Sequence, residues 1–210
     1  MAWIKRVIPG LALALSMASA SALAGTISVD FEHFPGPDGQ LGTADDVSSG
    51  NAFLMPLRDE YAALGLRFTQ ATLFQAGFFD GNPTNHFLSS TQPIAQFSMP
   101  VVGISIQSNS YWDATLTAYG VDGQVVASTV LANPNAGSTP LFGELSLSSN
   151  LPIYGFSVTA PTPGQILNLD NLRFTVAEVP EPQDAALFGA GLGMLGLGLR
   201  RRMRGKGKAD

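Results

Sequence analysis

Short runs of alternating apolar and polar residues fill the middle of this chain, and Gly, Pro, Asn or Ser interrupts each run. Residues 26–32 read Thr-Ile-Ser-Val-Asp-Phe-Glu, so every second side chain is apolar. This period of two places one face of a strand on a core and the other face in solvent. Similar runs lie at 65–74, 94–99, 101–107, 114–119, 124–131, 141–147, 153–159 and 166–176. The pattern predicts an all-β fold.

Local signals predict how these strands are joined. The segment 119–124 contains Asp122 and Gly123 and is typical of a hairpin turn. Residues 98–100 predict a break between two strands, because Pro100 cannot donate to a ladder. One short helix is expected at 56–64, with a proline in its first turn and Gly65 as its stop. About nine strands and no fixed-period repeat predict an antiparallel β-sandwich, a jelly roll, over residues 25–177.

The N-terminus has the three parts of a secretory signal peptide. Lys5 and Arg6 form a charged leader, and an apolar run follows at 7–17. Small residues come next, and the segment ends Ala22-Leu23-Ala24 before Gly25. The Ala-x-Ala pattern predicts removal of residues 1–24 by signal peptidase, with cleavage after Ala24. The alternative is a helix that stays in the membrane, although its apolar run is short for a span.

The C-terminus combines three features in a fixed order. Val179, Pro180, Glu181 and Pro182 come first. Fifteen residues at 185–199 follow, of which five are glycine and the others apolar. They reach only about 22 Å as a helix, less than a bilayer core of about 30 Å. The segment ends at a basic cluster that should stay on the cytoplasmic side and that contains Arg200, Arg201 and Arg202.

This order of features resembles the PEP-CTERM sorting signal over residues 179–208. The resemblance implies recognition of the tail by an exosortase in the inner membrane, removal of the tail, and delivery to the cell surface or extracellular matrix. It also implies an association with exopolysaccharide. An ordinary tail anchor is the alternative. The expected chain therefore has a signal helix at 1–24, a sandwich at 25–177 and a sorting tail with a short transmembrane helix at 178–208.

The middle of the chain also resembles the β-sandwich ectodomains that precede such tails. The matching segments are 30–32, 61–68 and 169–174. These ectodomains are similar to galactose-binding domains and to carbohydrate-binding modules. The resemblance implies the fold, and it does not identify a ligand.

The charge of the middle segment excludes one class of partner. Between Gly25 and Glu178 there are thirteen acidic and three basic residues, a net charge of −10. Binding to nucleic acid needs a basic face for the phosphates, so no nucleic-acid partner is expected. The chain also lacks cysteine, so the exported domain must be held together by its core or by bound ions.

An acidic, glycine-rich loop at 38–46 is the candidate metal site. Asp38, Asp45 and Asp46 are its carboxylates, and Ca²⁺ prefers oxygen donors of this kind. The spacing does not fit an EF-hand, but the loop resembles aspartate-glycine calcium loops of other secreted bacterial proteins. The alternative is a solvated loop in which the aspartates bond their own backbone.

Two further groups of residues are candidates for binding. Tyr111, Trp112 and Asp113 include the one tryptophan outside the signal peptide, which would either stack on a sugar ring or pack in the core. An exposed Trp112 on a concave face would favour sugar binding. Glu32, Asp170 and Asn171 are expected to meet if the first and last strands pair, and the alternative is ordinary polarity at strand ends.

Catalysis finds little support in the sequence. The two histidines, His33 and His86, have no metal-binding spacing, and neither a nucleophile elbow nor a phosphate loop is present. We therefore expect a non-enzymatic surface or matrix protein with a structural or adhesive sandwich. A carbohydrate-binding module that retains exopolysaccharide is the second hypothesis. A glycoside hydrolase, which would need two converging carboxylates, is the third.

Overall fold

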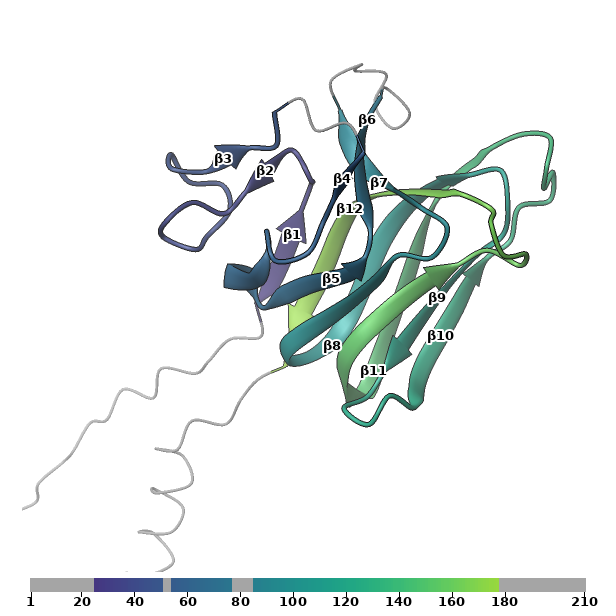
Figure 1. The fold of residues 1–210 in the computed structure, drawn as a ribbon. Coiled ribbons are helices and arrows are strands. Elements are labelled where there is room, and N and C mark those ends of the chain that lie inside the picture. The colour runs from purple at the N-terminus through teal and green to yellow at the C-terminus, as the bar shows by residue number, and fades with distance from the viewer. Residues whose placement is uncertain (1–24, 51–53, 77–84, 178–210) are drawn as a thin grey trace, which may run out of the picture. The chain divides into compact units, whose positions relative to one another are not determined.

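The computed structural model describes residues 25–50, 54–76 and 85–177, which lie within a compact unit at Ala24–Glu178. The described residues are nearly all in strands or in the turns between them, and every strand pairing is antiparallel (Figure 1). The prediction of an all-β, antiparallel fold is therefore confirmed. No helix among the described residues is long and apolar enough to cross a membrane. The predicted signal peptide and sorting tail lie outside the described residues.

Two long, bent strands organise the domain. β8 (Ile94–Ser110) and β11 (Leu141–Thr159) pair along most of their lengths, and their register shifts between Ser148 and Gly155. Each strand therefore contributes one half to each of two packed layers. Such corners, where a strand changes layers through a bend or bulge, are known from β-sandwiches.

The first layer contains five strands. It runs from β5 (Leu66–Gln70) through the first half of β8 and the second half of β11 to β9 (Ala114–Tyr119) and β10 (Val125–Leu131). The predicted bounds of β9 are those observed. The predicted hairpin turn also forms between β9 and β10, where the Gly120 amide donates to the Gln124 carbonyl.

The second layer is built on β12 (Leu167–Val176), which pairs with the second half of β8. β1 (Thr26–Val29) pairs with the end of β12, so the first and last strands are neighbours. The first half of β11 pairs with the other side of β8 in this layer. The layer continues beyond β12 through β7 (His86–Ser90), β6 (Thr72–Gln75) and β4 (Met55–Pro56). A separate short pair joins β2 (His33–Phe34) to β3 (Val47–Ser48).

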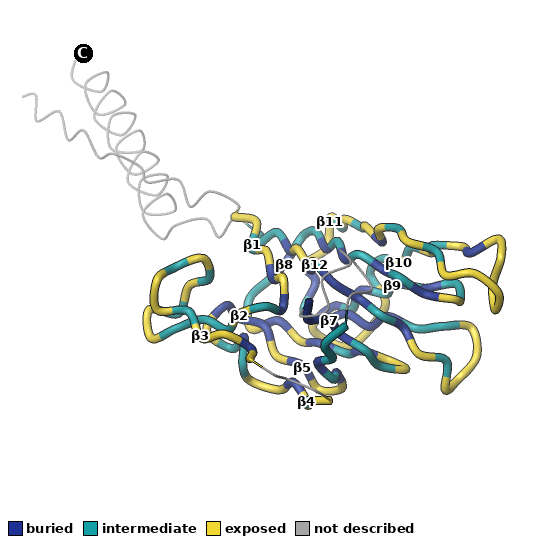
Figure 2. The backbone as a smooth tube through the Cα atoms, turned by 90° about the horizontal axis from the view of Figure 1, so that it is seen from above, coloured by how far each residue is buried: buried dark blue, intermediate teal, exposed yellow. Residues whose placement is uncertain are grey.

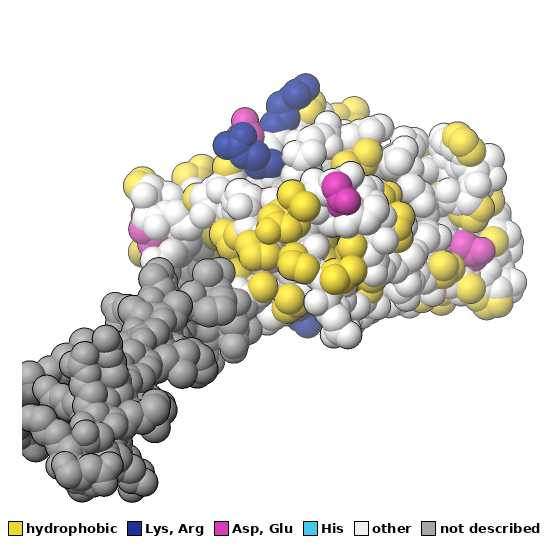
Figure 3. Space-filling model, turned by 90° about the horizontal axis from the view of Figure 1, so that it is seen from below, with side chains coloured by type: hydrophobic (Ala, Val, Ile, Leu, Met, Phe, Trp, Pro, Cys, Tyr) yellow, Lys and Arg dark blue, Asp and Glu magenta, His cyan; other side chains and the backbone are white. Residues whose placement is uncertain are grey.

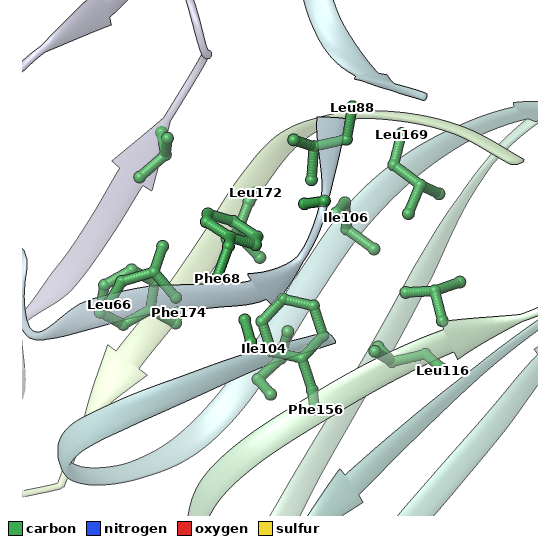
Figure 4. Close-up of a cluster of buried hydrophobic side chains, with 14 of the residues drawn as sticks. Leu66, Phe68, Leu88, Ile104, Ile106, Leu116, Phe156, Leu169, Leu172 and Phe174 are labelled. Atoms are coloured by element: carbon green, nitrogen blue, oxygen red, sulfur yellow. The ribbon is translucent and has the colours of Figure 1, made fainter. Parts of the chain in front are cut away.

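The apolar faces of the two layers meet in one core (Figures 2 and 4). Phe97 is central, with its ring centroid 5.8 Å from that of Phe156 in its own layer and 5.0 Å from that of Phe174 in the other. Phe31 and Phe68 extend the core towards the N-terminal segment, with ring centroids 6.2 Å apart. The alternating pattern of the sequence therefore identifies the core faces of these strands.

Two local predictions were wrong. The break predicted at 98–100 is a bend within β8, because pairing with β11 resumes at Val101 after Pro100. The helix predicted at 56–64 is reduced to a 3-10 turn at Ala62–Leu64. Backbone bonds to a distant segment prevent the helix, since the Leu57 amide donates to the Ala71 carbonyl. Gly65 does end the turn, in a left-handed conformation with φ 77°.

Candidate functional site

The predicted calcium loop is closed by its own hydrogen bonds. The Asp38 amide donates to Asp45 Oδ2 at 3.1 Å, and the Gly42 amide donates to Asp46 Oδ2 at 2.7 Å. The Thr43 hydroxyl donates to Asp45 Oδ1 at 2.7 Å, and this bond is the main reason that the pKa of Asp45 is lowered. Asp38 Oδ1 accepts a hydrogen bond from the Gln40 amide. This is the kind of local aspartate turn expected if the loop holds no metal ion. The described residues contain no group of three or more acidic, His or Cys side chains placed for a metal ion.

An open hollow of about 620 Å³ lies between this loop and the paired ends of β1 and β12. Asp30, His33 and Asp46 line it together with Asn171 and Arg173. Asn171 has φ 51°, an uncommon conformation for a residue with a side chain, and occupies a register shift in β12. The loop predicted as a metal site and the predicted Asn171 therefore share one polar hollow.

A buried polar cluster lies near the same strand ends and links three segments of the chain. We call Glu32, Asn85, His86 and Asp170 the acid–histidine cluster. Glu32 Oε1 accepts the His86 amide at 2.7 Å and Asn85 Nδ2 at 3.1 Å. Glu32 Oε2 lies 2.7 Å from His86 Nδ1. The sequence predicts the proximity of Glu32 and Asp170 from strand pairing, and it does not identify His86 as a partner.

The imidazole of His86 is enclosed by two oxygen acceptors. Its Nδ1 faces the Glu32 carboxylate, and its Nε2 lies 2.8 Å from the Gly50 carbonyl oxygen. Both ring nitrogens of His86 therefore face an oxygen atom. Only 5% of the His86 side chain and 30% of the Glu32 side chain are exposed.

Asp170 is the most deeply buried acid of the cluster, with 1% of its surface exposed. Burial raises its pKa to about 7, and the charges of Glu32 and Asp30 act in the same direction. The Asn171 amide donates to its Oδ1 and opposes this shift. Asn85 Oδ1 is also buried, with no hydrogen-bond partner among the described residues. The cluster joins β12 to the start of β7 and to the segment that follows β1.

The predicted aromatic site supports a loop instead of lining a hollow. Trp112 is half-buried, and a Cβ built on Gly137 would lie 3.2 Å from its ring. The Gly137 amide donates to the Tyr111 carbonyl at 2.7 Å, and the Asn133 amide donates to Asp113 Oδ1 at 2.7 Å. All three predicted residues thus contact the loop at 132–140, and Trp112 is not part of the buried core.

A second hollow, of about 530 Å³, lies on the outer face of the first layer. Tyr119 and Tyr154 line it with three polar side chains, those of Gln92, Gln96 and Ser157. We call it the tyrosine hollow. No carboxylate is among the residues that line it. Figure 3 shows hydrophobic side chains gathered on the lower end of the domain, with acidic side chains only scattered among them.

A glycine in the tyrosine hollow allows a close approach of the neighbouring strand. In the register of the sheet, Gly155 lies between Tyr119 on β9 and Gln96 on β8, so all three share one face. A Cβ on Gly155 would come within 2.9 Å of the Ala95 carbonyl oxygen, closer than side-chain carbons approach, so this position requires glycine. The Tyr119 hydroxyl reaches Ser157 Oγ at 2.9 Å, two residues further along β11. The Tyr119 side chain therefore extends along the strand direction towards Ser157.

The tyrosine hollow is not evident from the sequence alone. Its residues come from segments far apart in the chain, and the strand pattern shows only that Tyr119 and Ser157 alternate with core residues. Gly155 is the one local signal, because glycine inside a strand pattern often marks a bulge or a close approach of another backbone.

Comparisons with known proteins do not place the chain in a family. No family model matches it, and no curated protein matches it. Among solved structures, it is similar to the K2 cleaved adhesin domain of Lys-gingipain, with 12% identity, 72% of this chain and 100% of that domain covered, and a TM-score of 0.45. An arabinose-bound α-L-arabinofuranosidase gives 13% identity and a TM-score of 0.40 over 61% of this chain. This match spans 27% of that enzyme's length.

A third similar structure is CBM32-1 from a family 31 glycoside hydrolase of Clostridium perfringens. It gives 13% identity and a TM-score of 0.32, with 52% of this chain and 93% of that module covered. The structural neighbours are thus adhesin and carbohydrate-binding domains and glycoside hydrolases. At these identities and TM-scores, none of the likenesses carries weight for a ligand or an activity.

Proposed function

We propose that the chain is an exported cell-surface or matrix protein whose β-sandwich binds polysaccharide without catalysis. Its two ends support export, because a signal-peptide pattern precedes the domain and a PEP-CTERM-like tail follows it. In this proposal, signal peptidase and an exosortase process the chain at the inner membrane. The mature domain then remains at the surface or in the matrix and holds exopolysaccharide there.

The tyrosine hollow is the observation that carries the binding function. Sugar rings present apolar C–H faces and hydroxyl edges, and Tyr119 provides an aromatic ring in the lining of the hollow, beside Gly155, which has no side chain. The amides of Gln92 and Gln96 can both donate to and accept from sugar hydroxyls. With no carboxylate in its lining, the hollow suits neutral sugars and provides no acid pair for hydrolysis.

Replacing Tyr119 with alanine should weaken binding to a neutral polysaccharide about tenfold, because the stacking surface is lost; tenfold corresponds to about 1.4 kcal/mol. Tyr119→Phe should retain most of the affinity, since the ring remains. Isothermal titration of the full chain with a soluble neutral glucan or galactan would measure the effect, and a uronic-acid polymer would test the preference for neutral sugars.

Tyr111→Ala is the matched control for this experiment. Tyr111 is 49% exposed, lies outside the tyrosine hollow and is also an aromatic residue of the surface. Its loss should leave the affinity within twofold of the parent. Equal affinities for Tyr119→Ala and the parent would exclude the hollow as the binding site. No binding to any polysaccharide would instead favour a purely structural sandwich.

We also propose calcium binding at the acidic loop, with Asp38, Asp45 and Asp46 as ligands. The Thr43 hydroxyl bonds the carboxylates of both Asp45 and Asp46. A cation would have to replace these bonds and bring Asp38 to the same point. Binding to the native state alone would stabilise it by about 2.7 kcal/mol at a hundredfold excess over the dissociation constant. Calcium should therefore raise the melting temperature and a chelator should lower it. The double variant Asp45→Asn/Asp46→Asn is the control and should respond to neither treatment. If calcium and a chelator also leave the melting temperature of the parent unchanged, the proposal is contradicted.

A further inference from the structure

The end of the domain at which the chain enters and leaves has a hollow of its own. β1 starts there at Thr26, and the Ala177 amide, which follows β12, donates to the Pro100 carbonyl in the bend of β8 (Figure 1). A hollow of about 510 Å³ lies beside these ends of the chain, and both Thr26 and Met99, the residue before Pro100, line it. We call it the terminal hollow.

The lining of the terminal hollow is mainly apolar, and the described residues that line it include no charged side chain. Its apolar residues are Ile27, Leu41, Ala63, Leu64 and Met99. The bend of β11 adds Leu151, which is 59% exposed and lies at the same end, because Ile153 pairs with Val101 just after the bend of β8. Figure 3 views this lower end of the domain and shows hydrophobic side chains gathered on it. The acidic domain therefore presents an uncharged, apolar surface where the chain leaves it.

The sequence after β12 limits what this surface can reach. Seven residues, 178–184, separate Ala177 from the apolar segment at 185–199. An extended chain covers at most about 3.5 Å per residue, so this connection spans no more than about 25 Å. The opposite end of the domain is about 30 Å further away, since β8 rises about 3.3 Å per residue from Val101 to Ser110. With 185–199 in a bilayer, the end with the terminal hollow is therefore the one held near the lipid.

We propose that the terminal hollow and Leu151 lie on the outer surface of the bilayer while the tail is inserted. This inference rests on the proposed sorting function, and it adds a lipid contact made by the domain itself. The net charge of −10 would repel anionic headgroups, so the partner that fits an uncharged, apolar lining is a bilayer of zwitterionic lipid. A short connection gives an effective concentration of about millimolar, so a weak contact is sufficient. The contact would keep residues 178–184 at the membrane surface, where the proposed peptidase acts.

Quenching of a dye on the domain by labelled lipid tests this contact. The chain has no cysteine, so Ala63→Cys, at an exposed alanine of the terminal hollow, introduces a single thiol for an environment-sensitive dye. The labelled full chain is reconstituted in phosphatidylcholine vesicles that contain spin-labelled phosphatidylcholine. The spin label should quench this dye at least twofold more than a dye at Thr139→Cys. Thr139 is exposed at the opposite end of the domain, where Asn133 Nδ2 donates to the carbonyls of both Ser110 and Thr139.

A charge placed on this surface should weaken the contact. Leu151→Asp should lower the quenching of the Ala63 dye at least twofold, because a carboxylate loses its water when it is pressed against lipid. Leu151 is largely exposed, so the core does not depend on it. Thr139→Asp is the matched control, which adds the same charge at the opposite end and should leave the quenching unchanged. Circular dichroism should show the same fold in both variants.

Flotation of the vesicles separates this inference from the sorting function. A chain that does not float with the vesicles would contradict both the insertion of the tail and the lipid contact. A chain that floats, but whose dyes at positions 63 and 139 are quenched equally, would overturn the lipid contact alone. The terminal hollow would then be a surface for a protein partner or for none. Equal quenching in Leu151→Asp and Thr139→Asp would likewise overturn it.

Discussion

Replacing Pro180, Glu181 and Pro182 with alanine should leave the chain inserted in the membrane but almost completely block removal of its tail. Each proline fixes its own φ and biases the preceding residue away from helix. Under the proposed sorting function, this bias keeps the motif open to a membrane peptidase. Insertion in that proposal depends on the apolar segment at 185–199 and on the arginines behind it, which remain. A blot for the domain should show an unprocessed, membrane-held form in place of the released one.

The domain offers a matched control for this experiment. Pro161 and Pro163 form another Pro-x-Pro sequence, fully exposed in the loop before β12. Replacing residues 161–163 with alanine should leave processing unchanged, because that loop is not part of the tail. Normal trimming and export of the variant at 180–182 would show that the tail is not a sorting signal. The segment would then be only an anchor.

The strands were predictable wherever alternation continued without interruption. Ala114–Tyr119 matches its predicted bounds, because every second residue faces the core and a strong turn follows. Pro100 was misread, since the same residue type ends strands and also occurs where a strand bends between layers. Only the pairing of β8 with β11 on both sides of the bend distinguishes the two cases, and pairing is not local information.

The candidate site was predictable where the topology itself brought residues together. Pairing of β1 with β12 brings the Glu32 and Asp170 segments close to each other, as first and last strands often pair. His86 was not predictable, because it is 54 residues from Glu32 and its strand was not recognised. The tyrosine hollow depends on the register of three strands, which alternation alone does not fix.

The largest loss of stability in the domain should follow from Glu32→Ala. The Glu32 carboxylate accepts three hydrogen bonds in the acid–histidine cluster, two from His86 and one from Asn85. Its removal leaves the His86 backbone amide, the His86 ring and the Asn85 amide group without their shared acceptor. Leaving a buried polar group without its partner typically costs about 1–3 kcal/mol, and several at once are a large part of a domain's stability. Urea unfolding of the full chain, followed by tryptophan fluorescence, would measure the loss.

Glu144→Ala is the control for charge, because Glu144 is an exposed glutamate on β11. Its truncation should change the free energy of unfolding by no more than about 0.5 kcal/mol. The double variant Glu32→Ala/His86→Leu should recover part of the loss, since it removes the buried ring that has lost its acceptor and replaces it with an apolar side chain. If Glu32→Ala and Glu144→Ala are equally stable, the Glu32–His86 pair contributes nothing to the fold. The acid–histidine cluster would then not be what joins the start of β7 to the segment after β1.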